Sequence, residues 1–121
     1  MDSTQKLLEF AENIDINPLF DKIRSITGLS DLKFTHKIYE RNGYVSIQFQ
    51  SQDISDKIGF LKLIFSEIKI EQFNSEVREK NENIFWWGTV DFRYKHPHGG
   101  SNGCTFLTFR YDERSGWEFD E

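Results

Sequence analysis

Apolar residues near the N-terminus recur every three or four positions, which is the spacing of a helix with one buried face. The first predicted helix covers residues 3–13, with Asp2 as its N-cap. The second has Asn17 as its cap and Pro18 at the first helical position, and Gly28 ends it. The predicted apolar stripes consist of Leu7, Leu8, Ala11 and Ile14 in the first helix and of Leu19, Phe20, Ile23 and Ile26 in the second.

Apolar and polar residues then alternate over 33–38 and again over 44–50, as in strands that are buried on one face. Between these runs lies Asn42-Gly43, a dipeptide that favours a two-residue type I′ hairpin turn because both of its residues tolerate positive φ. Such a turn places Arg41 opposite Tyr44, Ile38 opposite Ile47 and His36 opposite Phe49. The same register puts Phe34, Ile38, Val45, Ile47 and Phe49 on one face.

Residues 54–66 show helical spacing again, and we predict a third helix there. Its apolar stripe consists of Ile54, Ile58, Leu61, Phe65 and Ile68. Gly59 is unfavourable inside a helix, so a strand that begins as early as Phe60 is the alternative. From Ile68 onward the alternation of a strand returns, with a bulge expected near Gln72.

The most regular alternation covers residues 84–95 and predicts a long strand. One face carries Ile84, Trp86, Val90, Phe92 and Tyr94 with Gly88, and the other carries Phe85, Trp87, Thr89, Asp91, Arg93 and Lys95. The connection over 96–103 leads to a strand over 104–111, and a short last strand includes Trp117 and Phe119.

This order of elements predicts a single α+β domain over residues 1–121. Short links favour antiparallel pairing, so we expect a sheet of about five to six strands, built from the hairpin and a C-terminal meander. About three helices would cover one face of this sheet in a two-layer sandwich.

Composition suits a protein of the cytoplasm. A chain of 121 residues buries enough surface to fold without a disulfide or metal staple. Cys104 is the only cysteine, no apolar run approaches the ~18 residues of a membrane span, and no secretory signal begins the sequence. We therefore expect no disulfide within the chain, no membrane contact and a cytoplasmic location.

The negative charge is concentrated at the C-terminal end. The formal net charge is −5, and the last ten residues contribute −4 because they hold five acidic residues against Arg114 alone. General nucleic-acid binding requires lysine and arginine to displace counterions, so we do not expect it. An acidic end favours solubility, or a basic protein partner.

The segment 96–103, His-Pro-His-Gly-Gly-Ser-Asn-Gly, is the most unusual in the chain. Two histidines two positions apart suit a metal ion, and glycine-rich backbone suits an anion, with His98 as the acid or base of a hydrolase. No spacing supplies a third metal ligand, and the ending of a P-loop is missing, so we favour a wide turn with no metal and no cofactor. The residues of the alternative ligand loop are His96, His98, Gly99, Gly100, Ser101 and Asn102.

Phe85 and Trp87 are predicted to lie on the face opposite the main apolar set. Exposed aromatic residues rimmed by charges are typical of the centre of a protein interface. A homodimer contact and a core position beneath another element are the alternatives. The predicted partner-binding residues are Phe85, Trp87, Asp91, Arg93, Asp112, Glu113, Glu118, Asp120 and Glu121.

Three further features have simple structural interpretations. His36 is expected to be a buried, hydrogen-bonded histidine and Cys104 a small inert strand residue. The acidic pairs Asp112/Glu113 and Asp120/Glu121 are expected to be solvated carboxylates, because glycosidase pairs require a cleft that fixes their separation. We predict no catalytic residue.

The C-terminal third resembles a known group of proteins. The stretches Trp87–Tyr94, His96–Gly103 and Gly116–Phe119 are similar to the C-terminal half of small uncharacterised proteins from phages and prophages of low-GC bacteria. This resemblance implies an accessory protein of a mobile element, present in the host cytoplasm if the chain is phage-encoded. Such proteins often inhibit a host enzyme, including defence nucleases.

Three functions follow as hypotheses. The first is a non-enzymatic, small acidic inhibitor of the phage anti-defence (anti-CRISPR-like) or toxin-immunity type, whose partner is a host or toxin enzyme such as a nuclease. The second is a nucleotide- or anion-binding protein or hydrolase that uses the loop at His96–Asn102. The third is a homo-oligomeric structural protein of a phage.

Overall fold

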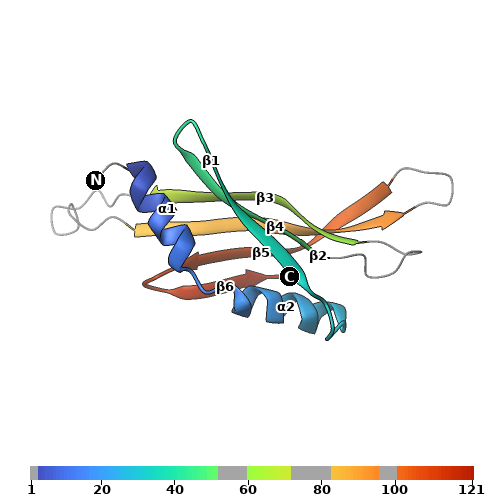
Figure 1. Cartoon of the computed structure of the whole chain (residues 1–121). Coiled ribbons are helices and arrows are strands. Elements are labelled where there is room, and N and C mark those ends of the chain that lie inside the picture. The colour runs from blue at the N-terminus through green and yellow to red at the C-terminus, as the bar shows by residue number, and fades with distance from the viewer. Residues whose placement is uncertain (1–2, 52–59, 72–82, 96–100) are drawn as a thin grey trace.

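The computed structural model describes residues 3–51, 60–71, 83–95 and 101–121. Within these ranges, two helices precede six strands (Figure 1). These elements are α1 (Ser3–Asn13), α2 (Asn17–Thr27), β1 (Phe34–Arg41), β2 (Tyr44–Ser51), β3 (Phe60–Glu71), β4 (Asn83–Lys95), β5 (Ser101–Asp112) and β6 (Gly116–Asp120). The strands form one antiparallel sheet in the order β1-β2-β3-β4-β5-β6, which confirms the α+β class and the antiparallel meander.

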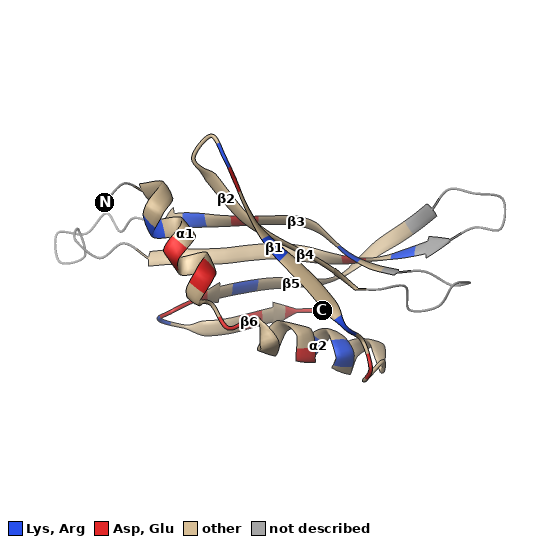
Figure 2. Ribbon diagram, viewed as in Figure 1, with Lys and Arg blue, Asp and Glu red and all other residues tan. Residues whose placement is uncertain are grey.

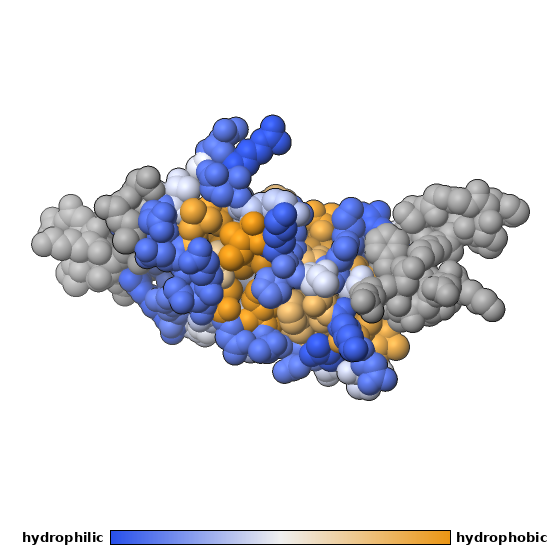
Figure 3. Space-filling view, in the orientation of Figure 1, coloured by the Kyte–Doolittle hydropathy of each residue, from blue (hydrophilic) through white to orange (hydrophobic). Residues whose placement is uncertain are grey.

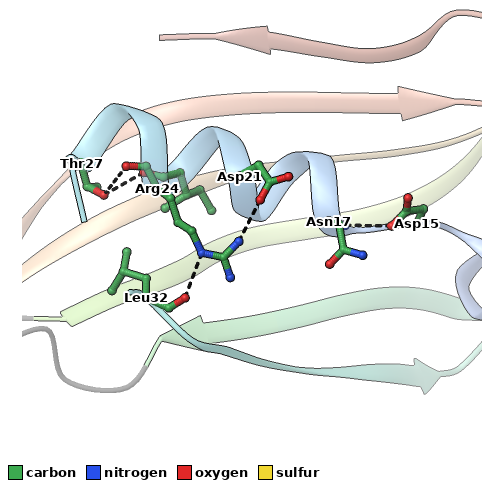
Figure 4. Close-up of polar contacts among 7 residues, drawn as sticks. Asp15, Asn17, Asp21, Arg24, Thr27 and Leu32 are labelled. Carbon is green, nitrogen blue, oxygen red and sulfur yellow. Dashed lines mark hydrogen bonds and ion pairs between the residues drawn. The ribbon is translucent and has the colours of Figure 1, made fainter. Parts of the chain in front are cut away.

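The ends of α2 show which local signals were interpreted correctly (Figure 4). Gly28 ends the helix as predicted, with φ of 73° and its N–H donating to the carbonyl of Arg24 at 2.9 Å. The cap assigned to Asn17 was wrong, because Asn17 is already helical and its N–H donates to Asp15 Oδ1 at 3.1 Å. The carboxylate two residues earlier therefore satisfies a free N–H of the first turn. Asp2, the predicted cap of α1, lies outside the described residues.

The first hairpin has the predicted register. Arg41 pairs with Tyr44, Ile38 with Ile47 and His36 with Phe49. Asn42 and Gly43 both have positive φ, 54° and 84°, as the type I′ turn requires.

The predicted third helix was wrong, because the part of it within the described residues belongs to strand β3. The alternative start at Phe60 agrees with the first residue of this strand. Leu63 pairs with Val90 but Phe65 pairs with Thr89, so Ile64 is an extra residue that forms a bulge. The segments 54–59 and 72–82, which include the bulge expected near Gln72, lie outside the described residues.

The core lies between the two helices and one face of the sheet, which we call the inner face. Trp86 lies at the centre of this core and is 0% exposed. Its ring centroid lies 4.6 Å from that of Phe109 and 6.5 Å from that of Phe49. The indole N–H donates to Ser66 Oγ, so the one polar atom of the buried ring is satisfied. The buried apolar residues are Leu7, Phe10, Ala11, Ile16, Leu19, Phe20, Ile23, Leu32, Val45, Ile47, Phe49, Leu61, Leu63, Ile68, Trp86, Val90, Leu107 and Phe109.

Helix α2 contacts both edge strands of the sheet. Phe20 stacks on Phe34 of β1 with ring centroids 4.3 Å apart. Lys22 Nζ lies 5.7 Å from the ring centroid of Phe119 in β6 and 2.5 Å from Glu121 Oε1. One helix reaches both edges only if the sheet curves around it. Figure 3 views this helix-bearing side, where hydrophilic side chains cover the helices and apolar ones gather between α1 and β1.

Gly88 provides a test of packing at the centre of β4. A Cβ atom at this position would lie 2.4 Å from the carbonyl oxygen of Phe65 and 2.8 Å from Cζ of Phe109. We expect Gly88→Ala to lower the free energy of unfolding by about 1–3 kcal/mol, as overpacking does in other cores. Urea denaturation at pH 7 measures the change.

Gly28→Ala is the matched control, because its Cβ would meet nothing within 4 Å although its φ is +73°. Its cost should be limited to the roughly 1–2 kcal/mol of a left-handed alanine. A loss at Gly88 below about 1 kcal/mol would contradict close packing of β4 against β3 and β5.

Candidate functional site

The face of the sheet opposite the helices, which we call the outer face, carries the large apolar side chains of highest exposure among the described residues. They are Tyr39, Tyr44, Ile64 and Phe65, with exposed fractions of 44%, 68%, 41% and 45%. Tyr39 and Tyr44 adjoin the inward-facing Ile38 and Val45, so strand alternation directs both outward. The bulge in β3 adds Ile64 and Phe65, which lie together between buried Leu63 and the Ser66 that bonds Trp86.

Phe65, Phe85 and Trp87 form a row on this face, which we call the outer aromatic row. The ring centroids of Phe65 and Trp87 lie 4.9 Å apart. Trp87 and Phe85 are half-buried, whereas the neighbouring Trp86 is fully buried. The predicted outward position of Phe85 and Trp87 agrees with this arrangement.

A shallow pocket of about 370 Å³ adjoins the row on the side of β5 and β6. Its lining residues are Phe85, Trp87, Thr108, Phe109, Arg110, Glu118, Phe119 and Asp120. We call it the aromatic–acidic pocket, because rings of β4 form one side and carboxylates of β6 form the other. Glu118 pairs in register with Arg110, and Asp120 pairs with Thr108, so β6 delivers both carboxylates to the outer face.

The two cations that lie over rings of the outer aromatic row, Arg110 and Lys69, are already paired with carboxylates. Arg110 Cζ lies 4.1 Å from the ring centroid of Phe85, and its Nη2 lies 3.1 Å from Glu71 Oε2. Lys69 Nζ lies 5.9 Å from the ring centroid of Trp87 and 3.3 Å from Glu67 Oε2.

Glu118 and Asp120 differ from these carboxylates. Both are exposed, and neither forms an ion pair or side-chain hydrogen bond with any described residue. Figure 2 marks the acidic positions of β6 in red. The pocket therefore has two carboxylates available to an incoming group.

Asp112 has a structural position instead. Its side chain is buried, and Oδ1 accepts the backbone N–H groups of Arg114 at 2.8 Å and Ser115 at 2.6 Å. The expectation of a solvated carboxylate was thus wrong for Asp112, because the turn between β5 and β6 folds over it.

The hydrogen bonds also determine the charge of Asp112. Burial acts to raise the pKa of its carboxyl, but the N–H groups of Ser115 and Arg114 act in the opposite direction. A hydrogen bond from Asn83 and the charge of Arg110 act with them, so the pKa of Asp112 lies below its ordinary value.

The other predicted partner-binding residues do not gather at the pocket. Asp91 is buried, and its Oδ2 lies 2.7 Å from Arg93 Nε, in an ion pair whose angles are not those of a hydrogen bond. Glu121 pairs with Lys22, and Glu113 is exposed in the last turn. Four residues of the predicted set, Phe85, Trp87, Glu118 and Asp120, line one pocket.

The prediction for His36 was wrong. It lies opposite Phe49 as expected, but its side chain is exposed because β1 is an edge strand. Cys104 lies in β5 and is exposed with a free thiol.

The alternative ligand loop stays a prediction. His96, His98, Gly99 and Gly100 lie outside the described residues, whereas Ser101 and Asn102 belong to β5 rather than to the connection. Within the described ranges, no group of three or more His, Cys, Asp or Glu side chains is placed to hold a metal ion. Neither helix of the described chain has the length and apolar character needed to cross a bilayer.

Sequence reasoning missed Phe65 and Arg110 as residues of this face. Phe65 was assigned to a helix, and only the bulge makes it face outward. The outward position of Arg110 could have been predicted, because Leu107 and Phe109 face inward and strand alternation then directs Arg110 outward.

Comparison with known proteins finds no family model, no curated protein and no solved structure that matches this chain.

The lowered pKa of Asp112 predicts a pH-dependent contribution to stability. A carboxyl whose pKa is lower in the folded state stabilises the fold fully above its unfolded pKa, near 3.8, and loses that effect as the pH falls through the folded pKa. We expect Asp112→Ala to cost about 1–3 kcal/mol at pH 7 in urea denaturation, and the cost to shrink below pH 3.8.

Asp112→Asn keeps an acceptor for the turn but removes the charge, so it should cost less than Asp112→Ala at pH 7. Glu113→Ala, at the exposed neighbour, should cost less than about 0.5 kcal/mol. A cost of Asp112→Ala that is constant from pH 7 to pH 2.5 would show that its charge does not stabilise the fold.

Proposed function

We propose that this chain is a non-enzymatic, acidic protein-binding inhibitor of the phage anti-defence or toxin-immunity type, which blocks an enzyme by occupying its surface. In this proposal the helices and the sheet form two layers, and the outer face is left free for the partner. The observation that carries it is the outer aromatic row beside a pocket with two unpaired carboxylates. Exposed apolar side chains that gather on one face of a small protein mark an interaction site.

The residue types on this face support binding through contact. Tryptophan, tyrosine and arginine are the side chains that most often dominate binding energy at protein interfaces. The outer face presents Trp87, Tyr39, Tyr44 and Arg110 on strands that hydrogen bonds to their neighbours hold in place. A preorganised surface of this kind loses little conformational entropy when a partner binds.

The charge of the chain supports a basic partner. The net charge is −5, and Glu118 and Asp120 place negative charge beside the outer aromatic row. Electrostatic complementarity mainly accelerates association and suppresses wrong partners. An enzyme that binds nucleic acid has a basic surface, and a chain that covers this surface inhibits the enzyme without chemistry of its own.

Trp87→Ala tests the proposal. We expect the affinity for the purified host or toxin enzyme to fall about tenfold or more, because a central aromatic anchor is lost, while the thermal midpoint changes little. Biolayer interferometry with the enzyme recovered by affinity capture measures the first quantity, and differential scanning fluorimetry measures the second.

Glu12→Ala on the helix-bearing side is the control and should leave affinity unchanged. Affinity capture and sedimentation of the free chain together supply the outcomes that would contradict the proposal. An inert monomer that recovers no stoichiometric partner would contradict the proposal, and an oligomer that Trp87→Ala dissociates would replace it with a homo-oligomeric structural role.

A further inference from the structure

We infer that the aromatic–acidic pocket binds an arginine side chain of the protein partner. This inference rests on the proposed function and adds to it the chemical group that is recognised. The guanidinium would stack against the ring of Trp87, and it would donate hydrogen bonds to the carboxylates of Glu118 and Asp120.

The pocket combines the two surfaces that a guanidinium requires. A guanidinium is a planar, delocalised cation that stacks on aromatic faces, and its fork of N–H groups matches a carboxylate. The rings come from β4 and the carboxylates from β6, two strands apart in the sheet. Glu118 and Asp120 are separated by one residue, so they face the same side about 6–7 Å apart along the strand.

The charge balance around the pocket favours a cation. Arg110 is the one cation among the residues that line it. Its guanidinium is neutralised by Glu71 at 3.1 Å and by Asp112 at 3.6 Å. The carboxylates of Glu118 and Asp120 therefore remain uncompensated by the described residues. A phosphate or another carboxylate would be repelled at the same place.

The chain already makes one contact of the proposed kind. The guanidinium of Arg110 lies over Phe85, with 4.1 Å between Cζ and the ring centroid, while its N–H groups contact carboxylates. An incoming guanidinium would repeat this arrangement on Trp87 and the two free carboxylates. Arginine fits better than lysine, because an ammonium neither stacks as a plane nor donates in a fork.

The size and openness of the pocket favour a side chain of a partner over a free metabolite. About 370 Å³ is near the lower limit of small-molecule sites, and the carboxylates at its rim are exposed. A single arginine held in this way binds weakly, so the rest of the partner has to contribute through the outer aromatic row.

Peptide titration of the uniformly ¹⁵N-labelled full chain tests the inference directly. The probe is the peptide acetyl-Gly-Arg-Gly-amide, and the control is the same peptide with citrulline, which has arginine's shape without its charge. We expect the arginine peptide to shift the Trp87 indole N–H and the amides of Glu118 and Asp120, with smaller shifts for a lysine peptide and none for citrulline. Equal shifts with citrulline, or shifts that omit Trp87, would overturn it.

The double variant Glu118→Gln/Asp120→Asn should abolish these shifts without changing the thermal midpoint. Glu12→Gln/Asp31→Asn is the matched control, since it removes the same charges from exposed positions outside the pocket and should retain the shifts. Arginine-dependent shifts that persist in the first variant would overturn the role of the carboxylates.

The purified partner separates this inference from the proposed function. We expect Glu118→Gln/Asp120→Asn to weaken partner binding about tenfold or more and the matched control to leave it within about twofold. Binding that depends on Trp87 but not on the two carboxylates would overturn the arginine inference and leave the proposed function standing. Absence of any partner that depends on Trp87 would remove both.

Discussion

The structure depends on a constraint in β4, where side chains of successive residues point to opposite faces of the sheet. Burial of a ring as large as that of Trp86 removes about 150–250 Å² from water, which is worth roughly 4–6 kcal/mol. Its indole N–H is also bonded to Ser66. A slip of one residue would turn this ring to the outer face and point Asp91 and Arg93 into the core, so the register of β4 is fixed. Trp87 then has to lie on the outer face, and the outer aromatic row is a consequence of the core.

Local chemistry made much of the fold predictable. Gly28 at the end of α2 and Asn42-Gly43 in the first hairpin each need positive φ, and the structure has it at all three. Alternation in β4 was equally informative, because no bulge interrupts that strand. These signals depend on residues close together in the sequence, which is why the sequence alone was enough.

The prediction of a third helix was wrong for a physical reason that is not visible in a single sequence. The extra residue at Ile64 shifts the inward-facing positions of β3 by one, from Leu61 and Leu63 to Ile68 and Ile70. Two strand segments joined by a bulge therefore place apolar residues three and four apart, which is also helical spacing. The bulge is set by pairing with β2 and β4 on both sides, and these partners are distant in sequence.

The candidate site was predictable in its aromatic part but not in its acidic part. The faces of Phe85 and Trp87 follow from alternation alone. Which acids are free depends on tertiary contacts: Asp112 is covered by its own turn, Asp91 is buried beside Arg93, and Glu121 reaches Lys22 of α2. Most of the net charge lies in the last ten residues, yet within them the fold uses some carboxylates for its own stability.

The pair on β6, Glu118 and Asp120, is different because β6 is an edge strand with one neighbour, β5. The one cation that β5 offers is Arg110, which two other carboxylates already bind. The ion pairs of Arg110 with Glu71 of β3 and with Asp112 thus leave Glu118 and Asp120 without a cation among the described residues.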